Sequence, residues 1–408
     1  MTPVWPIPGA SDIHSPMGAF QLQVEDVAHA RDRAERLASE GRGVALADDL
    51  EAGEPLSGES LAALLLSEEV ETGALLELAA RKRPAGGPQL ETFSPLYISN
   101  ECDAECAMCG MRSGNAALRR ETAPAGAVRD QLDILWQRGI RSVAILTGEY
   151  RHGSRRRQML ARSADAVRDA LDRGFQHVLI NVGSLETEEY APLLDGIERR
   201  ADGRLAPHVT MCTFQEAYAP EVYRSFMGEA AANPRSDYAR RLINFDRAAD
   251  AGMRSVNPGI LLGLSRDLAG ELFALASHVE HLLARDLQVY ISLPRLKKAN
   301  GTMHRRAATD DELFRVAALL AARFPAAKVV ISTREAPEIQ QRLLPVMGVL
   351  TAGSPGVAPY DASGARFDLE ASQFEVADQR PFEAILGEAL AAGAKIDGYE
   401  PRASAPTP

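Results

Sequence analysis

From about residue 93 onward, apolar residues follow two alternating patterns. Short runs rich in β-branched and aliphatic residues are separated by longer segments whose apolar residues recur at helical spacing. Short buried runs that alternate with amphipathic segments predict parallel strands joined by crossover helices. Eight strands are predicted, at 93–99, 142–147, 177–182, 208–214, 254–262, 287–293, 328–333 and 346–351.

The segments between these strands supply the expected helices. They lie at 124–138, 155–173, 237–251, 268–285 and 309–323. Eight strand–helix units favour an α/β fold of the (β/α)8 TIM-barrel type over an open doubly wound sheet. Residues that carry chemistry are then expected in the loops that follow the strands, because these loops form the active face of such a barrel.

Residues 1–88 differ from this pattern. Residues 1–20 are rich in proline and glycine and are expected to be irregular, whereas 26–40 and 59–82 have helical apolar spacing. The sequence therefore predicts an N-terminal helical extension over 1–88, a barrel over 89–395 and a disordered tail over 396–408.

Composition excludes some classes of function. The chain is 46% hydrophobic and 25% charged, with a net charge of −11, so it can bury a large core but lacks the basic footprint of a nucleic-acid-binding protein. No apolar run of membrane length and no secretion signal are evident, which predicts a cytoplasmic protein with reduced thiols. The basic run 151–157 is expected to be solvated surface, with a docking patch for an acidic electron donor as the less favoured alternative.

Three of the four cysteines follow the first predicted strand within eight residues, as Cys102, Cys106 and Cys109. Three thiolates on one loop can hold three irons of a 4Fe-4S cube and leave the fourth iron open to a small molecule. Zinc bound with a distant fourth ligand, Cys212 or a histidine, is an alternative, although paired zinc knuckles usually show two close pairs of ligands. Cys212 is otherwise expected to be a small buried hydrophobe.

The cysteine spacing resembles that of the radical S-adenosylmethionine (SAM) enzymes. In them the open iron binds the amino and carboxylate groups of SAM, and the reduced cluster cleaves SAM to a 5′-deoxyadenosyl radical. Gly148 and Glu149, one strand later, resemble the Gly-Gly-Glu element that holds the SAM amino group, and Met108 occupies the position that neighbours the adenine. Asn181 and Gln215, at the ends of two later strands, are expected to complete the cofactor site.

Longer stretches narrow the resemblance to the aromatic amino-acid lyases of this superfamily, and within them to the tryptophan lyases that form 3-methyl-2-indolic acid in thiopeptide antibiotic biosynthesis. The tyrosine lyases carry Tyr and Phe where this chain has Met108 and Met111. The resemblance to the aromatic amino-acid lyases is carried by 95–100, 214–218, 257–260, 293–295 and 372–374, and that to the tryptophan lyases by 108–112, 114–115, 146–150, 226–228 and 354–360.

This resemblance also implies a substrate site. Arg334 would bind the substrate carboxylate, and Tyr97 and Thr351 would lie near the substrate. A guanidinium suits the first role because its planar fork binds a carboxylate through two hydrogen bonds. A surface ion pair between Arg334 and Glu335 or Glu338, and a plain barrel-core position for Tyr97, are the alternatives.

The implied reaction removes a hydrogen atom from the amino group of L-tryptophan, fragments the part of the molecule that bears the carboxylate and moves that one-carbon fragment to indole C2, with the remaining carbon and nitrogen lost. A reducing partner such as flavodoxin or ferredoxin would supply the electron. Cleavage of another aromatic amino acid such as tyrosine stays open, as does a biotin-synthase-like insertion, which would normally need a second cluster. A non-catalytic metal-binding or electron-transfer protein is the alternative of a different class.

Overall fold

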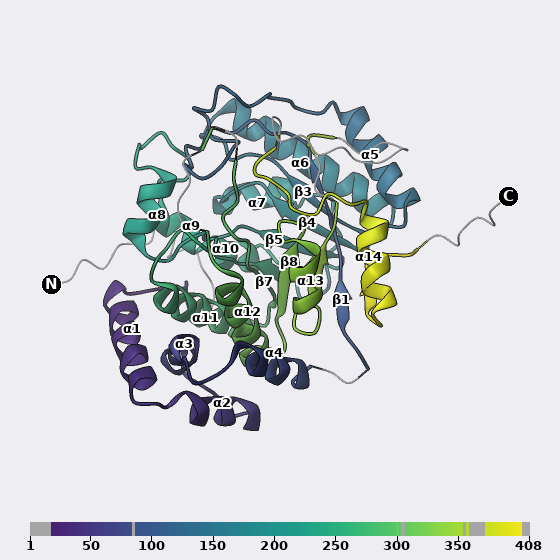
Figure 1. The fold of residues 1–408 in the computed structure, drawn as a ribbon. Helices are drawn as coiled ribbons and strands as arrows, with labels where there is room; N and C mark the ends of the chain where they lie inside the picture. The colour runs from purple at the N-terminus through teal and green to yellow at the C-terminus, as the bar shows by residue number, and fades with distance from the viewer. Residues whose placement is uncertain are drawn as a thin grey trace.

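The computed structural model describes residues 18–83, 86–299, 301–302, 307–353, 356–358 and 372–401. Its centre is a curled sheet of parallel strands with helices around the outside (Figure 1), so the predicted α/β fold of the TIM-barrel type is confirmed. The strands are β1 Gln89–Glu91, β2 Ser94–Tyr97, β3 Ser142–Leu146, β4 His177–Asn181, β5 His208–Cys212, β6 Ser255–Asn257, β7 Gln288–Ser292, β8 Lys328–Ser332, β9 Val349–Thr351 and β10 Lys395–Asp397.

Helices follow most of these strands. They are α5 Ala125–Gln137, α6 Ser154–Asp172, α7 Thr187–Leu193, α8 Pro220–Met227, α9 Tyr238–Leu242, α10 Asn244–Asp250, α11 Leu268–Ala284, α12 Asp310–Arg323, α13 Pro337–Leu343 and α14 Phe382–Ala391. Local signals fix several ends. Thr309 and Glu312 form a reciprocal capping box at the start of α12, and Gly174, with φ of 90°, ends the turn that follows α6.

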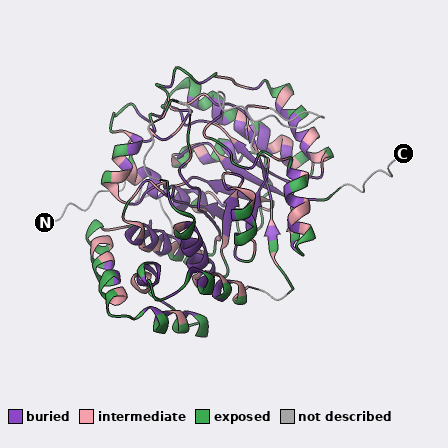
Figure 2. Ribbon diagram, in the orientation of Figure 1, coloured by how far each residue is buried: buried purple, intermediate pink, exposed green. Residues whose placement is uncertain are grey.

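Burial follows the layers of the fold. The strands are buried along almost their whole length, whereas the helices show buried inner and exposed outer faces (Figure 2). One large apolar cluster fills the space between strands and helices, and a smaller one inside the barrel joins Phe93, Leu179 and Tyr290 with residues of β3, β8 and β9. This two-layer core holds the carboxyl ends of the strands in place and therefore positions the loops that follow them.

The eight predicted strands are all present as β2–β9, in sequential order. In the described part of the chain no backbone ladder joins the first of them to the last. Thr92 Oγ1 instead donates to the Leu350 carbonyl at 2.7 Å, and Ser94 Oγ donates to the Ala352 carbonyl at 3.0 Å. The predicted fifth strand, 254–262, is shortened to Ser255–Asn257 because Pro258 has no N–H to donate.

Two short strands were not predicted. β1 pairs with both β9 and β10, and β10 lies at the edge of the sheet. The tail was predicted to begin at residue 396. Residues 395–397 instead pair with 89–91 in the sheet, and Tyr399 is only 9% exposed, so the ordered chain continues past the predicted boundary. Residues 402–408 of the expected tail and residues 1–17 of the N-terminal segment lie outside the described residues.

The N-terminal extension consists of α1 Val24–Ser39, α2 Gly43–Ala52, α3 Gly58–Leu66 and α4 Thr72–Arg81, which lie together against α11 and α12 (Figure 1). The segment 59–82, which has helical apolar spacing, forms two helices, α3 and α4. The chain turns between α3 and α4, where the Arg315 guanidinium of α12 donates to the carbonyls of Leu64, Leu65, Ser67 and Val70. The predicted helix 237–251 is likewise divided into α9 and α10 at Ile243.

Within the described residues, no helix combines the length and the apolar character needed to cross a membrane.

Candidate active site

The loop that follows β2 carries Cys102, Cys106 and Cys109 and is fastened on several sides. The Asp103 N–H donates to the Glu149 carbonyl at 2.9 Å, and the Ala107 N–H donates to the Phe226 carbonyl at 2.7 Å. The Arg120 guanidinium also donates to three carbonyls within 100–112. Since these bonds come from three separate segments, the loop conformation depends on tertiary contacts as well as on its own sequence.

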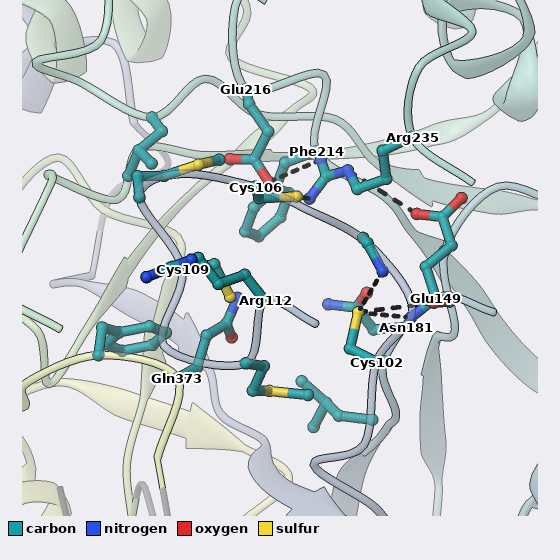
Figure 3. A pocket seen from close by; sticks show the side chains of 18 of the residues that line it. Cys102, Cys106, Cys109, Arg112, Glu149, Asn181, Phe214, Glu216, Arg235 and Gln373 are labelled. Atoms are coloured by element: carbon teal, nitrogen blue, oxygen red, sulfur yellow. Dashed lines mark hydrogen bonds and ion pairs between the residues drawn. The ribbon is translucent and has the colours of Figure 1, made fainter. Parts of the chain in front are cut away.

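All three of these cysteines line one cavity of about 930 Å³ at the carboxyl ends of the strands, part of it open to solvent. In Figure 3 they surround the open centre of the view, with Glu149 and Asn181 beside Cys102, and Arg235 and Glu216 beside Cys106. Burial raises the pKa of the Cys102 thiol to about 12 and that of Cys106 to about 11. A cationic iron would reverse this effect, because a coordinating metal favours the thiolate.

The arrangement suits an open iron-sulfur cluster. Among the described residues, no three histidine, cysteine or acidic side chains surround a single metal ion. Cluster thiolates do not need such an arrangement, because each of them binds a different iron. The fourth cysteine has another partner, since the Cys212 Sγ in β5 donates to Asn257 Oδ1 at 3.1 Å and its residue is 5% exposed, as expected for a buried cysteine.

Glu149 lies at the end of the loop after β3 and is 5% exposed. Its Oε1 accepts from the Ser184 N–H at 3.0 Å, and its Oε2 accepts from Arg241 Nη1 at 2.9 Å. A carboxylate offers about four lone-pair sites, so capacity for an ammonium group remains. Gly183, with φ of 87°, makes room for this side chain, because a Cβ there would lie 2.4 Å from Glu149 Cγ.

Gly148 lines the cavity, and its lack of a side chain allows a close contact with Glu101 and Cys102 of the cysteine loop. A Cβ at this position would lie 2.2 Å from the Glu101 carbonyl oxygen and 2.5 Å from Cys102 Cβ. The glycine therefore lets the loop after β3 lie directly against the cysteine loop. Glu149 and Cys102 consequently remain close, and the Glu149 N–H donates to Cys102 Sγ at 3.3 Å.

Arg235 and Glu216 are site residues that the sequence did not reveal. Arg235 Nη1 donates to Cys106 Sγ at 3.4 Å, and its Nη2 donates to Glu216 Oε1 at 3.1 Å. Glu216 has φ of 70°, an uncommon left-handed conformation of the kind often found at functional sites. Glu216 belongs to one of the resembling stretches, but Arg235 lies in a long loop between α8 and α9 where no local pattern marks it.

The opposite side of the cavity is formed by Arg334 and Tyr97. The Arg334 guanidinium carbon lies 3.3 Å from the centroid of the Phe374 ring, and its Nη1 is 3.4 Å from the Arg295 carbonyl. The alternative of an ion pair with Glu335 is not what the structure shows, because Glu335 accepts from Arg295 Nε at 2.9 Å. In the described portion of the chain no carboxylate pairs with Arg334, which leaves a cation available within the cavity.

Tyr97 also points to the cavity rather than only to the barrel core. Its hydroxyl donates to Gln373 Oε1 at 3.1 Å, and burial raises its pKa to about 12, so the hydroxyl stays protonated near neutral pH.

Most of the residues expected at the site are brought together. Besides the three cysteines, the cavity is lined by Tyr97, Met108, Gly148, Glu149, Asn181 and Arg334. Gln215 and Thr351 are 2% and 7% exposed and are not among the lining residues. Thr351 ends β9, and Gln215 Nε2 is buried and has no hydrogen-bond partner among the described residues. The expected roles of these two residues therefore lack the geometric support that the others have.

The basic run 151–157 is largely paired. Arg155 forms ion pairs with Asp103, at 2.9 Å, and with Glu101, while Arg156 is buried and paired with Glu189. These pairs tie the start of α6 to the cysteine loop and to α7. Apart from the buried Arg156 the run is exposed, as expected for a solvated surface, but Arg155 and Arg156 are already paired and do not form a free basic patch for docking.

Comparison with known proteins identifies similar sequences and similar structures. No family model matches the chain. The 2-iminoacetate synthase of Escherichia coli is 27% identical over 350 residues, which cover 82% of this chain and 86% of that protein. The FeFe-hydrogenase maturase HydG from Carboxydothermus hydrogenoformans is similar in structure, with a TM-score of 0.78, 20% identity, and coverage of 93% of this chain and 86% of that one.

Methylornithine synthase (PylB) shares the fold as well, with a TM-score of 0.64, 16% identity, and coverage of 86% of this chain and 97% of that one. The protein thus has the α/β barrel fold of these enzymes. In sequence it is similar to the 2-iminoacetate synthases of Escherichia coli and Salmonella typhimurium.

Proposed function

We propose that this protein is a radical SAM lyase that converts L-tryptophan to 3-methyl-2-indolic acid. The observation that carries the proposal is the content of one cavity. It is lined by three clustered cysteines, by the acidic residue Glu149 and, on the opposite side, by Arg334, which has no carboxylate partner among the described residues. Such a set offers separate places for a cluster, for SAM and for a substrate carboxylate.

In this proposal the three thiolates hold a 4Fe-4S cluster, and Glu149 accepts a hydrogen bond from the SAM amino group. Met108 and Asn181 line the same cavity and would contact the rest of SAM. When bound, cluster and SAM would supply the adenosyl radical that removes a hydrogen atom from the substrate, with the electron drawn from a donor such as flavodoxin or ferredoxin. The chain itself contributes orientation and exclusion of water.

Arg334 would fix the amino acid through its carboxylate, because a guanidinium binds a carboxylate with two parallel hydrogen bonds and stays protonated. Burial lowers its pKa, but nearby Tyr97 and Glu216 oppose this effect. Tyr97 would present a neutral hydroxyl beside the bound carboxylate. The two residues together would set which hydrogen faces the cofactor, and the choice of hydrogen decides the reaction.

Tyrosine is the second candidate substrate. The similarity to 2-iminoacetate synthase favours fragmentation of an amino acid without specifying tryptophan. Met108 and Met111 both line the cavity and stand where the tyrosine lyases carry Tyr and Phe. The flexible side chain of Met111 can adapt to a different aromatic ring, which favours tryptophan, whereas Met108 is assigned to the SAM side of the cavity.

Product analysis tests the proposal. The cluster would be reconstituted without oxygen, and the enzyme then incubated with SAM, a reductant and either L-tryptophan or L-tyrosine. We expect 5′-deoxyadenosine in the presence of tryptophan, together with 3-methyl-2-indolic acid. If p-cresol or other fragments formed from tyrosine and no product formed from tryptophan, the substrate would be tyrosine. A protein that never cleaves SAM would be a carrier rather than an enzyme.

A further inference from the structure

Residues 372–378, which we call the closing segment, lie across the cavity and are anchored on three of its walls. The Gly110 N–H of the cysteine loop donates to the Gln373 carbonyl at 2.8 Å. The Glu375 N–H donates to the Lys298 carbonyl at 2.7 Å, and the Asp378 N–H donates to the Thr333 carbonyl at 3.0 Å. The segment therefore joins the cluster-bearing loop to the loops that follow β7 and β8.

Its side chains reach both ends of the proposed site. Gln373 accepts from the Tyr97 hydroxyl at 3.1 Å and its side chain also hydrogen-bonds Cys109, which it neighbours in Figure 3. The next residue, Phe374, places its ring 3.3 Å from the Arg334 guanidinium carbon. Two consecutive residues thus contact a cluster ligand, the tyrosine and the arginine.

The choice of an aromatic ring beside Arg334 has a chemical consequence. A neighbouring carboxylate would occupy the N–H fork and neutralise its charge, whereas a ring stabilises the cation through its face and leaves the N–H edge free. The other partner of the guanidinium, the Arg295 carbonyl, is a neutral acceptor at 3.4 Å. Arg334 is therefore held in one orientation while retaining its capacity to bind an anion.

The contact with the cysteine loop is tight enough to set the position of the ring. A Cβ on Gly110 would lie 2.7 Å from the Ser372 carbonyl oxygen and 2.9 Å from that of Gln373. Because these are backbone atoms, the closing segment would have to move if residue 110 carried a side chain. The distance from cluster to Phe374 is consequently set by packed backbone.

We infer that Phe374 is a positioning residue that orients Arg334 for the carboxylate of an amino-acid substrate, and that the closing segment aligns this anchor with the cluster. The inference rests on the proposed function, since it takes the substrate to be an amino acid bound by Arg334. It predicts that Phe374 acts on carboxylate recognition specifically and not on the aromatic part of the ligand.

The test compares ligands with and without a carboxylate. Affinities for L-tryptophan and L-tryptophan amide, and for L-tyrosine and its amide, would be measured by anaerobic titration of the enzyme loaded with cluster and SAM. In Phe374→Leu we expect tryptophan to bind about tenfold more weakly, because the cation–π contact that orients the guanidinium is lost. The affinity for the amide should stay unchanged, and Phe374→Tyr should restore wild-type discrimination.

Two further variants sharpen the result. Glu375→Gln is the matched control, because this exposed side chain lies on the same segment and only its backbone bonds to Lys298. Adding Phe374→Leu to Arg334→Lys should produce little further loss if Phe374 acts through Arg334. Cluster absorbance and SAM affinity would verify that each variant keeps its fold.

The outcomes separate the inference from the function on which it rests. Equal losses for acid and amide would make Phe374 an ordinary packing residue, and unchanged binding of both would remove it from the site. Wild-type protein that binds neither amino acid would overturn the proposed function, and the inference with it.

Discussion

The barrel buries two polar clusters, one at each end, and they are organised differently. The upper cluster, at the carboxyl ends of the strands, contains Arg235, Arg241, Glu149, Glu216 and Arg334 around the cavity. The lower cluster, among residues nearer the amino ends of β4, β5 and β8, contains Glu91, His177, His208, Tyr290 and Lys328. Both contain charged groups that are costly to bury, and the upper cluster lines the cavity.

In the lower cluster the side chains bond one another. Glu91 accepts from the Tyr290 hydroxyl at 2.8 Å and pairs with Lys328, while His177 Nε2 lies 2.7 Å from Thr210 Oγ1. The His177 and His208 rings stack 3.7 Å apart. Because each member has a protein partner, this network can stabilise the barrel without binding anything.

In the upper cluster, charged side chains that line the cavity have hydrogen-bonding groups that no atom of the described residues occupies. Arg334 has no carboxylate partner within the described segments, and Arg235 Nε lies 3.8 Å from Glu149 Oε2 without a hydrogen bond. Buried donors that lack partners cost free energy, and such a cost is recovered when a ligand supplies the missing acceptor. The comparison teaches that similar residue types bond one another at one end of the barrel and keep unused hydrogen-bonding capacity beside a cavity at the other.

The largest expected effect is at the cysteines. Replacing Cys102, Cys106 or Cys109 with Ala should abolish iron-sulfur absorbance or SAM cleavage, because each thiolate would hold one iron. Cys212→Ala, whose thiol contacts Asn257, should leave both nearly intact. A requirement for Cys212 in cluster assembly, measured by iron and sulfide content, would contradict the open site.

The next effect concerns the carboxylate of the upper cluster. Glu149→Gln removes the charge that would pair with the SAM ammonium, so SAM affinity should fall by about 1.5 to 3 kcal/mol, or about ten- to a hundredfold. Equilibrium dialysis with the clustered protein measures this loss. Unchanged SAM affinity would remove Glu149 from the cofactor site.

The matched substitution in the lower cluster should affect stability instead. Glu91→Gln deprives Lys328 of its anionic partner inside a partly buried network, so the free energy of unfolding should fall by about 2 kcal/mol. SAM affinity should be unaltered. Chemical denaturation together with dialysis checks both parts, and a loss of SAM affinity in Glu91→Gln would erase the distinction between the two clusters.

The smallest effect is a dependence of stability on pH. Burial lowers the pKa of His208 from 6.5 to about 3, so its neutral form stabilises the fold fully above pH 6.5 and progressively less as pH falls toward 3. His208→Phe retains a ring for stacking but cannot titrate. Between pH 7 and pH 5 the wild type should lose about 1 kcal/mol more unfolding free energy than the variant. Parallel losses in denaturation curves at the two pH values would show that folding does not lower the pKa of His208.

Much of the fold could be predicted because parallel barrel strands are short, buried and rich in β-branched residues. All eight predicted strands are present, and β3 and β4 lie within one residue of their predicted bounds. The missed strands β1 and β10 have only three residues each, and their alternating exposure gives no strong apolar run. β1 forms by pairing with β9 and β10, and β10 forms by pairing with β1.

Within the site, the sequence indicated the residues whose spacing carries chemistry. The cysteine loop could be proposed from its spacing after a predicted strand, and Glu149 from the resemblance of Gly148 and Glu149 to the Gly-Gly-Glu element. Arg235 and Phe374 could not be assigned, since neither lies at a strand end and each reaches the cavity from a separate loop. The break between α3 and α4 was also missed, because it depends on carbonyls that Arg315 binds from another part of the chain.

The sequence by itself determined the set of chemical groups and their order along the chain: three thiols on one short loop, a carboxylate one strand later and an arginine after the seventh predicted strand. Local spacing suffices for this, because neighbouring strand ends meet at one face of a barrel. Only the tertiary structure decided which charges are already paired and which remain open to a ligand. Glu335 binds Arg295, while Arg334 rests on the ring of Phe374. That difference arises from packing between segments far apart in sequence, so local residue patterns do not predict it.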